Sequence, residues 1–204
     1  MPPKLLTLLF LSLGLFLNAQ VVINEIDADT PGTDQLEFVE LKSTTANFSL
    51  DGYVLVFFNA GSSAPYSGSS SYFAFDLDGY STDVNGIAMF GNNQVSPSPM
   101  GVFPNATIQN GPDVVALYLG NATDFPLNTP ATTTNLIDAL AYSNSTTQPS
   151  AMMTTLGIST CTNENATSSV ATHSIQRKND GSFETEVFRL ENFQGHINTD
   201  ISGY

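Results

Sequence analysis

The chain has 204 residues, with 19 Asp and Glu residues against 5 Lys and Arg residues, and a formal net charge of −14. This acidic balance argues against binding of nucleic acid or anionic membranes by long-range attraction, and it suits association with cations. The single cysteine, Cys161, excludes an internal disulfide, so side-chain packing must stabilise the fold. Its polar neighbours favour an exposed loop, and we assign it no role.

Residues 1–19 have the features of a secretory signal peptide. Lys4 supplies a positive charge, an apolar run follows from Leu5 to Leu17, and a small polar segment reaches Ala19. The run is too short to cross a bilayer as a helix, which takes about 20 apolar residues. We therefore expect cleavage near Ala19, a secreted or cell-surface protein without membrane insertion, one domain over residues 20–198, and a tail at 199–204.

Short apolar or alternating runs, separated by Gly-, Ser- and Pro-rich segments, predict an all-β sandwich or barrel. Val21–Ile26 and Leu36–Leu41 are the first two predicted strands, and a Thr-Pro-Gly-Thr turn joins them. Tyr53–Asn59 is continuously apolar and predicts a central strand that is buried on both faces. Further strands are expected at 72–75, 86–90, 114–119, 137–142 and 172–177, with long surface loops at 60–71, 92–101, 124–134 and 143–153. No helix longer than two turns is expected.

The stretch from residue 23 to residue 42 is unusually acidic. Glu25, Asp27 and Asp29 have the same parity, so in a strand they share one face. Like charges on one face must be solvated, paired or bound to a cation, and Lys42 is the only basic residue nearby in the sequence. We favour a solvated face. The alternative is a calcium site formed by Glu25, Asp27, Asp29 and Asp34, because calcium prefers oxygen ligands.

A second acidic stretch, at residues 76–85, contains Asp78-Gly79 and Asn85-Gly86 pairs. Such pairs are typical of hairpin turns, because Gly accepts positive φ and Asn or Asp bonds to its own backbone. The stretch lacks the glutamate six residues after Gly86 that the helix–loop–helix calcium motif requires. We therefore expect turns here and no metal site.

Nothing in the sequence favours catalysis. It contains no G-x-S-x-G or H-E-x-x-H motif and no phosphate-binding glycine loop, and its two histidines, His173 and His196, come late. Paired carboxylates could support glycoside hydrolysis, but only their geometry could show it. A carboxylate-based hydrolase is kept as a remote alternative.

Five N-x-S/T sequons occur, close to the number of about four expected by chance in a chain so rich in Asn, Ser and Thr. They lie at Asn47, Asn105, Asn121, Asn144 and Asn165. They are not evidence of glycosylation, but in a glycosylating host they would mark exposed loops.

Several segments together resemble the lamin tail domain family, in its secreted bacterial type. They are VVINEIDADTPGTDQLEFVEL (21–41), SLDGYVLVFFNAG (49–61), FDLDGYSTDVNG (75–86), IQNGPDVVALYLG (108–120), NLIDALAYS (135–143) and SIQRKNDGSF (174–183). The resemblance implies an immunoglobulin-like β-sandwich with a binding, tethering or assembly role and no catalytic residues.

We therefore expect a secreted, non-catalytic module without a cofactor that binds an extracellular protein, a glycan or a surface. The alternative is a calcium-dependent extracellular structural or matrix protein. Self-association through a sheet edge stays open, because an unpaired edge strand can recruit another strand.

Overall fold

The computed structural model describes residues 20–61, 68–165 and 173–187. The expected signal peptide at 1–19, the end of the expected domain at 188–198, which includes His196, and the tail at 199–204 lie outside these described residues, as does Thr172, the first residue of an expected strand. Within them, no helix combines the length and the apolar character needed to cross a bilayer.

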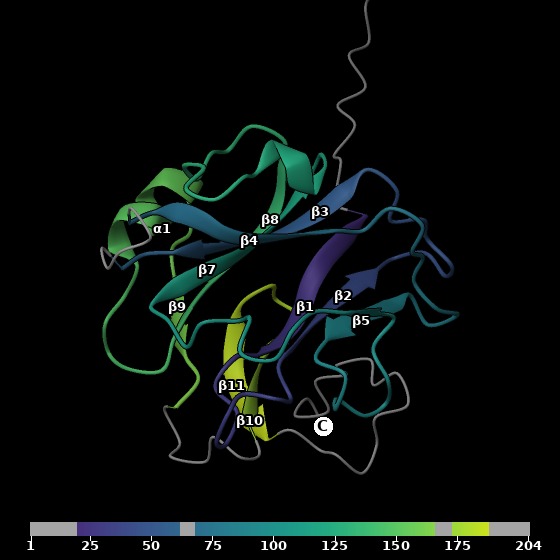
Figure 1. The fold of residues 1–204 in the computed structure, drawn as a ribbon, viewed down its shortest axis with the longest axis horizontal. Coiled ribbons are helices and arrows are strands. Elements are labelled where there is room, and N and C mark those ends of the chain that lie inside the picture. The colour runs from purple at the N-terminus through teal and green to yellow at the C-terminus, as the bar shows by residue number, and fades with distance from the viewer. Residues whose placement is uncertain (1–19, 62–67, 166–172, 188–204) are drawn as a thin grey trace, which may run out of the picture.

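Two sheets pack face to face (Figure 1), so the predicted all-β sandwich is confirmed. The first sheet has the order β11 (Phe183–Val187), β10 (His173–Arg177), β1 (Val21–Asp27), β2 (Phe38–Ser43), β5 (Ile87–Gly91) and β6 (Gly101–Val102). The second has the order β4 (Ser70–Asp76), β3 (Tyr53–Asn59), β7 (Asp113–Leu119), β8 (Leu136–Ser143) and β9 (Cys161–Asn163). Neighbouring strands are antiparallel except for the pairs β5–β6 and β8–β9.

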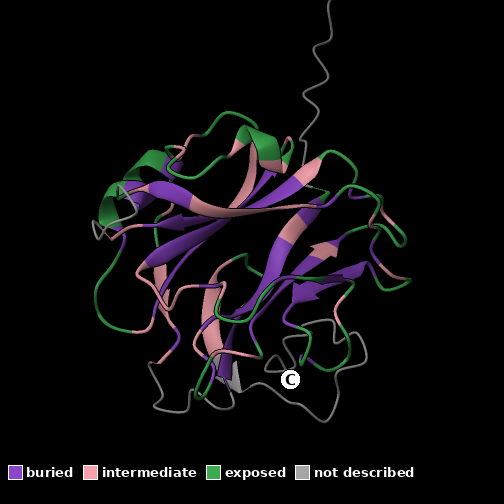
Figure 2. Ribbon diagram, viewed as in Figure 1, coloured by how far each residue is buried: buried purple, intermediate pink, exposed green. Residues whose placement is uncertain are grey.

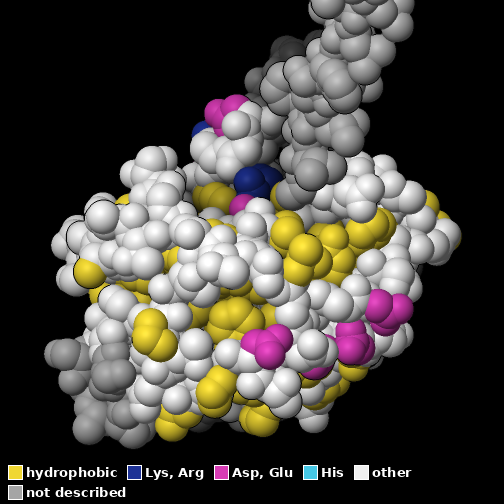
Figure 3. Space-filling view, turned by 90° about the horizontal axis from the view of Figure 1, so that it is seen from above, with side chains coloured by type: hydrophobic (Ala, Val, Ile, Leu, Met, Phe, Trp, Pro, Cys, Tyr) yellow, Lys and Arg dark blue, Asp and Glu magenta, His cyan; other side chains and the backbone are white. Residues whose placement is uncertain are grey.

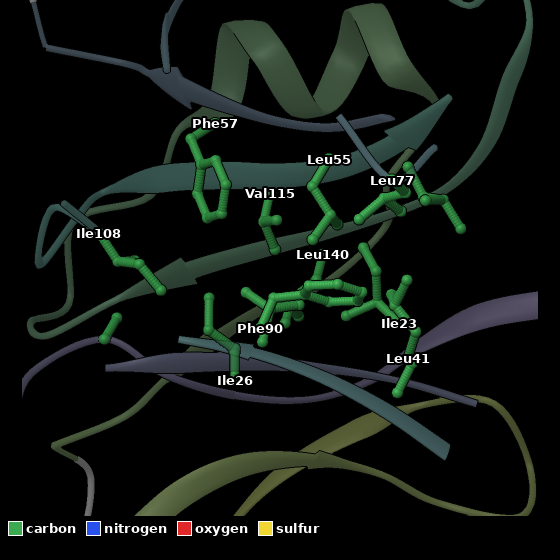
Figure 4. Close-up of a cluster of buried hydrophobic side chains, with 14 of the residues drawn as sticks. Ile23, Ile26, Leu41, Leu55, Phe57, Leu77, Phe90, Ile108, Val115 and Leu140 are labelled. Atoms are coloured by element: carbon green, nitrogen blue, oxygen red, sulfur yellow. The ribbon is translucent and has the colours of Figure 1, made fainter. Parts of the chain in front are cut away.

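The main core lies between the sheets, where inward-facing aliphatic and aromatic side chains meet (Figure 4). Leu55 and Phe57 of β3 face this core, while Val54, Val56 and Phe58 point to the opposite side. There a helix, α1 (Ser150–Leu156), and its neighbouring loops cover the second sheet with Met152, Met153 and Leu156. The prediction that β3 is buried on both faces is confirmed, as the burial colours in Figure 2 also show.

All eight predicted strands are present, with ends shifted by at most two residues. The sequence patterns did not predict β6, β9 or β11, nor α1, whose first four residues lie in the segment 143–153 that was expected to be a loop. These strands are short or late in the chain. The helix α1 has only seven residues, and Gly157, which caps its C-terminal end, has a φ of 73°. Cys161 is half-buried in β9, so its expected place in an exposed loop is wrong.

A β-bulge in β1 changes which side chains face the core. Ile23 lies opposite Leu41 and Glu25 opposite Glu40, so Asn24 is an extra residue in β1. Strict alternation would put Ile23 and Ile26 on opposite faces, yet both are fully buried in the core. The bulge thus lets both isoleucines point inward.

Candidate functional site

Most of the acidic residues near the start of the chain are buried. Glu25, Asp27, Glu37 and Glu40 are 8%, 7%, 0% and 3% exposed. The interpretation of this stretch as a solvated charged face is therefore wrong for these four residues. Glu164, which directly follows β9, is 1% exposed. We call these five side chains the carboxyl band. The face of the molecule seen in Figure 3 shows few acids in comparison: acidic side chains appear there in only a few separate places.

Neutral donors bind part of the band. Glu25 accepts hydrogen bonds from the hydroxyl of Ser174 and from the side-chain amide of Gln176, both in β10. Glu40 accepts one from the bulge residue Asn24, at 2.6 Å. The bulge thus contributes to the carboxyl band, because the extra residue of β1 donates a hydrogen bond to Glu40 on the neighbouring strand β2.

The other two glutamates of the band accept hydrogen bonds from the backbone. Glu37 Oε2 accepts from Thr107 N–H at 2.9 Å. Glu164 accepts from Ala28 N–H at 2.9 Å and from Asp29 N–H at 3.1 Å, so it holds the chain just beyond β1. The sequence pointed to the early acids but not to Glu164, because its contacts join residues more than 130 positions apart.

Burial raises the pKa of every member of the carboxyl band, since a charge is poorly solvated there. The pKa is raised to about 7 for Glu25 and Glu37, to about 8 for Glu40 and Glu164, and well above its usual value for Asp27. Repulsion adds to burial at Asp27, where Glu164 has the largest effect among the charged neighbours. Hydrogen bonds to the glutamates oppose the shifts.

Three oxygens in this region are buried without a hydrogen-bond partner among the described residues. They are Asp27 Oδ1, Glu37 Oε1 and the side-chain oxygen of Asn165. Buried polar atoms are nearly always paired, because an unpaired one loses its bonds to water without replacement. Asp27 directly precedes Ala28, and Asn165 directly follows Glu164. Because Ala28 and Glu164 are hydrogen-bonded, Asp27 and Asn165 lie in the same part of the fold.

Asp29 is half-buried and bound by neutral amides rather than by a basic residue. Its carboxylate accepts hydrogen bonds from the side chains of Asn110, Asn144 and Asn165, at 2.8, 3.2 and 2.7 Å. Two of the five sequon asparagines therefore use their amide nitrogen, the atom of glycan attachment, in an internal contact. The other three, Asn47, Asn105 and Asn121, are exposed.

The four residues of the predicted calcium site occupy different settings. Glu25 is bound to β10, Asp29 to the three amides, and Asp34 to the backbone N–H of Thr30 at 3.1 Å. Among residues 20–61, 68–165 and 173–187, no three Asp, Glu, His or Cys side chains come close enough together to hold a metal ion. Of the four, only Asp27 has an unpartnered buried oxygen.

The second acidic stretch forms turns, as predicted. Asp83 Oδ1 accepts hydrogen bonds from the N–H groups of Asn85 and Ile87, both at 2.8 Å, and Gly86 has a φ of 80°. Asp78, in the turn at Asp78-Gly79, accepts a hydrogen bond from Gly52 N–H at 2.6 Å. This bond joins that turn to the turn that precedes β3. These carboxylates have backbone partners and lie at the surface.

A groove runs along one edge of the second sheet. The parallel strand β9 pairs only with residues 141–143 of β8, and no described strand pairs with residues 136–140 on that side. The chain before β9 diverges from β8 there and leaves a space of about 350 Å³. We call this space the β8 groove; residues 136–141 and 156–160 line it, together with Arg177, Gly181 and Phe183.

The charged residues of the β8 groove bind each other. Asp138 forms an ion pair with Arg177 and also accepts a hydrogen bond from Ile23 N–H at 2.8 Å. Arg177 Nε donates to the carbonyl of Ile23 at 2.7 Å, and its guanidinium lies 4.3 Å from the centre of the Phe183 ring. The pair links β8 to β1 and β10, and burial raises the pKa of Asp138 although Arg177 opposes this.

The carboxyl band and the β8 groove are the two candidate sites. The band offers buried carboxyl oxygens, and the groove offers the backbone of a strand edge with which no described strand pairs. Comparison with protein-family models, curated proteins and solved structures found no match to this chain.

Proposed function

We propose that the protein is a secreted, non-catalytic module that binds an extended segment of another extracellular protein in the β8 groove. The observation that carries the proposal is the edge at residues 136–140 of β8, unpaired among the described residues and open to the groove. An unpaired edge presents backbone N–H and C=O groups in the spacing of a strand, and a peptide that adds as a further strand satisfies them.

The charges favour an extended peptide from a different protein. A second copy would also carry a net charge of −14, and like charges repel. The groove itself is close to neutral, since Asp138 and Arg177 form a pair, so a peptide with small or apolar side chains suits it. A glycan suits it less, because Phe183, the one aromatic residue among the described residues that line the groove, is covered by the Arg177 guanidinium.

Two features of the sequence support an extracellular location and a binding role. Residues 1–19 resemble a signal peptide, which supports export. The six segments that resemble the lamin tail domain family support an immunoglobulin-like module with a tethering or assembly role. The two-sheet architecture is compatible with such a module.

A displayed library of seven-residue peptides, selected against the purified protein, tests the proposal. We expect selected peptides to shift the backbone amide NMR signals of residues 136–140. Ser159→Trp, which places a bulky ring at the groove wall, should weaken their binding by about tenfold or more. Thr154→Trp, on the exposed side of α1 and away from the groove, is the matched control. Selected peptides that bind Ser159→Trp as tightly as the unmodified protein would refute the groove as the site.

A second candidate function is a calcium-dependent extracellular structural protein. One observation favours it: Asp27 has a buried carboxylate oxygen without a partner among the described residues. Thermal unfolding in calcium and in chelator tests this candidate independently of the groove.

A further inference from the structure

We propose that Asp27 and Glu164 together bind one divalent cation of the calcium type at the end of β1. This inference goes beyond peptide binding in the β8 groove and does not depend on it. It revises the metal ligands expected from the sequence: Glu164 is added to Asp27, and Glu25, Asp29 and Asp34 are no longer ligands.

The backbone brings the two carboxylates to the same place. Asp27 is the last residue of β1, and the next two N–H groups of the chain, those of Ala28 and Asp29, donate to Glu164. Each N–H occupies one Glu164 oxygen, and a carboxylate oxygen can accept a second partner. Glu164 is therefore fixed beside Asp27 and still has lone pairs for a cation.

An independent observation is the unpartnered oxygen of Asp27. Its side chain is 7% exposed, and Oδ1 finds no donor among the described residues. Lys42 is half-buried, and its charge opposes the rise in the pKa of Glu40. A buried carboxylate is costly unless it is paired, protonated or bound to a metal. One divalent cation between Asp27 and Glu164 removes the repulsion and gives Oδ1 a partner.

Neutral oxygens complete the shell. Since no three acidic, His or Cys side chains converge among the described residues, such a site takes no more than two carboxylates. The side-chain oxygen of Asn165 is buried and unpartnered next in sequence to Glu164, and Asp29 positions this amide through its nitrogen. Calcium takes six to eight oxygens, including amide, carbonyl and water oxygens, and sites with few charges bind with a Kd of about 10⁻⁴ to 10⁻³ M. That affinity suits an extracellular protein.

Thermal unfolding of the full chain in about 5 mM calcium chloride and in chelator, at matched ionic strength and pH 7.5, tests the site. We expect calcium to raise the Tm by about 3–5 °C through binding to the native state, and calorimetric titration to show one site. Asp27→Asn should abolish the rise. In chelator it should be at least as stable as the unmodified protein, because it removes a buried carboxyl group that lacks a partner for Oδ1 among the described residues. Asp51→Asn, at an exposed turn, should keep the full rise.

The outcomes show whether a cation or a proton neutralises the buried carboxyl groups of Asp27 and Glu164. If Asp27→Asn does not fold, Glu164→Gln replaces it, and the titration of the unmodified protein stands by itself. No calcium-dependent rise in the unmodified protein would overturn the proposal and leave protons as the neutralising species. A full rise in both Asp27→Asn and Glu164→Gln would also overturn it, because the cation would then bind elsewhere. Peptide binding in the β8 groove, measured in chelator, is unaffected by either result.

Discussion

Glu40 shows at the scale of one residue how this fold treats an acidic side chain. It lies in β2 between Val39 and Leu41, is 3% exposed, and has the neutral amide of Asn24 as its donor. Burial, with repulsion from Glu25, raises its pKa to about 8. The protonated form is therefore the one that the folded protein favours.

The variant Glu40→Gln tests whether the raised pKa of Glu40 affects the free energy of unfolding. The folded pKa lies above the usual value of 4.5, so Glu40 contributes stability in full below about pH 4.5 and loses it as the pH rises through 8. Each tenfold change in proton affinity corresponds to about 1.4 kcal/mol. Denaturant unfolding should thus show that Glu40→Gln is more stable than the unmodified protein near pH 9, with a smaller fall in stability between pH 5 and pH 9.

The matched control is Glu184→Gln, since Glu184 lies at the surface beside Lys178. This variant should follow the pH profile of the unmodified protein. If Glu40→Gln followed that profile too, Glu40 would not titrate with a raised pKa.

At the scale of elements, the Asp138–Arg177 pair replaces missing strand contacts. In β1, Ile23 precedes the part that pairs with β10, and its N–H and C=O groups bond to Asp138 and Arg177 instead. The two side chains thereby hold the start of β1, where β10 does not pair with it, against β8 of the second sheet.

Asp138→Asn should lower the free energy of unfolding by about 2–4 kcal/mol. Breaking a fully buried pair costs about 3–5 kcal/mol because the remaining charge is left unpaired. The side chains here are 16–17% exposed, and solvent reduces that cost. Lys178→Gln, which removes the exposed Lys178–Glu184 pair, should cost no more than about 1 kcal/mol. Equal losses in the two variants, measured by urea denaturation, would contradict this role of the Asp138–Arg177 pair.

The elements also show what the sequence could and could not predict. Hydrophobic periodicity located β3 to the residue, because its apolar run is long and uninterrupted. Strict alternation correctly placed Glu25 and Asp27 on one face of β1. It also put Ile23 on that face, whereas the bulge at Asn24 turns Ile23 to the opposite face, toward the core. Neither β9 nor β11 has such a pattern, since β9 has three residues and β11 alternates charged with uncharged residues.

Burial of the acids could not be predicted, because it depends on distant parts of the chain. The donors to Glu25 come from β10, about 150 residues later, and Glu164 reaches Ala28 from the far end of β9. No local pattern marks such contacts. The sequence alone shows that the stretch is unusually acidic, but it does not show that these carboxyl groups are buried.

At the scale of the whole molecule, the core between the sheets carries the stability that a disulfide cannot supply. Phe57 is fully buried and packs near Tyr72, Phe73 and Phe103, with ring centres 5.6–6.2 Å away. Phe57→Ala should lower the free energy of unfolding by about 3–5 kcal/mol. Phe125→Ala, at a half-buried ring on the outer side of the second sheet, should cost roughly 1–2 kcal/mol. Similar losses in both variants would contradict a core centred between the sheets.

The acidic residues behind the net charge of −14 fall into two groups, one at the surface and one in the interior. Acids in the exposed turns bond to backbone N–H groups, while the carboxyl band and Asp113 are buried. Burial raises the pKa of Asp113 to about 7. Together with Glu37 and Glu40, it makes the folded state bind protons more tightly than the unfolded chain.

The stability of the unmodified protein as a function of pH, measured in chelator, tests this burial of uncompensated carboxyl groups most directly. Because the pKa values of Glu37, Glu40 and Asp113 rise on folding to about 7, 8 and 7, stability is highest near pH 5 and falls as the pH passes through 7 and 8. We predict a Tm that decreases steadily between about pH 5 and pH 9. A Tm that stayed constant or increased over this range would show that these carboxyl groups are solvated or paired, and would contradict the account.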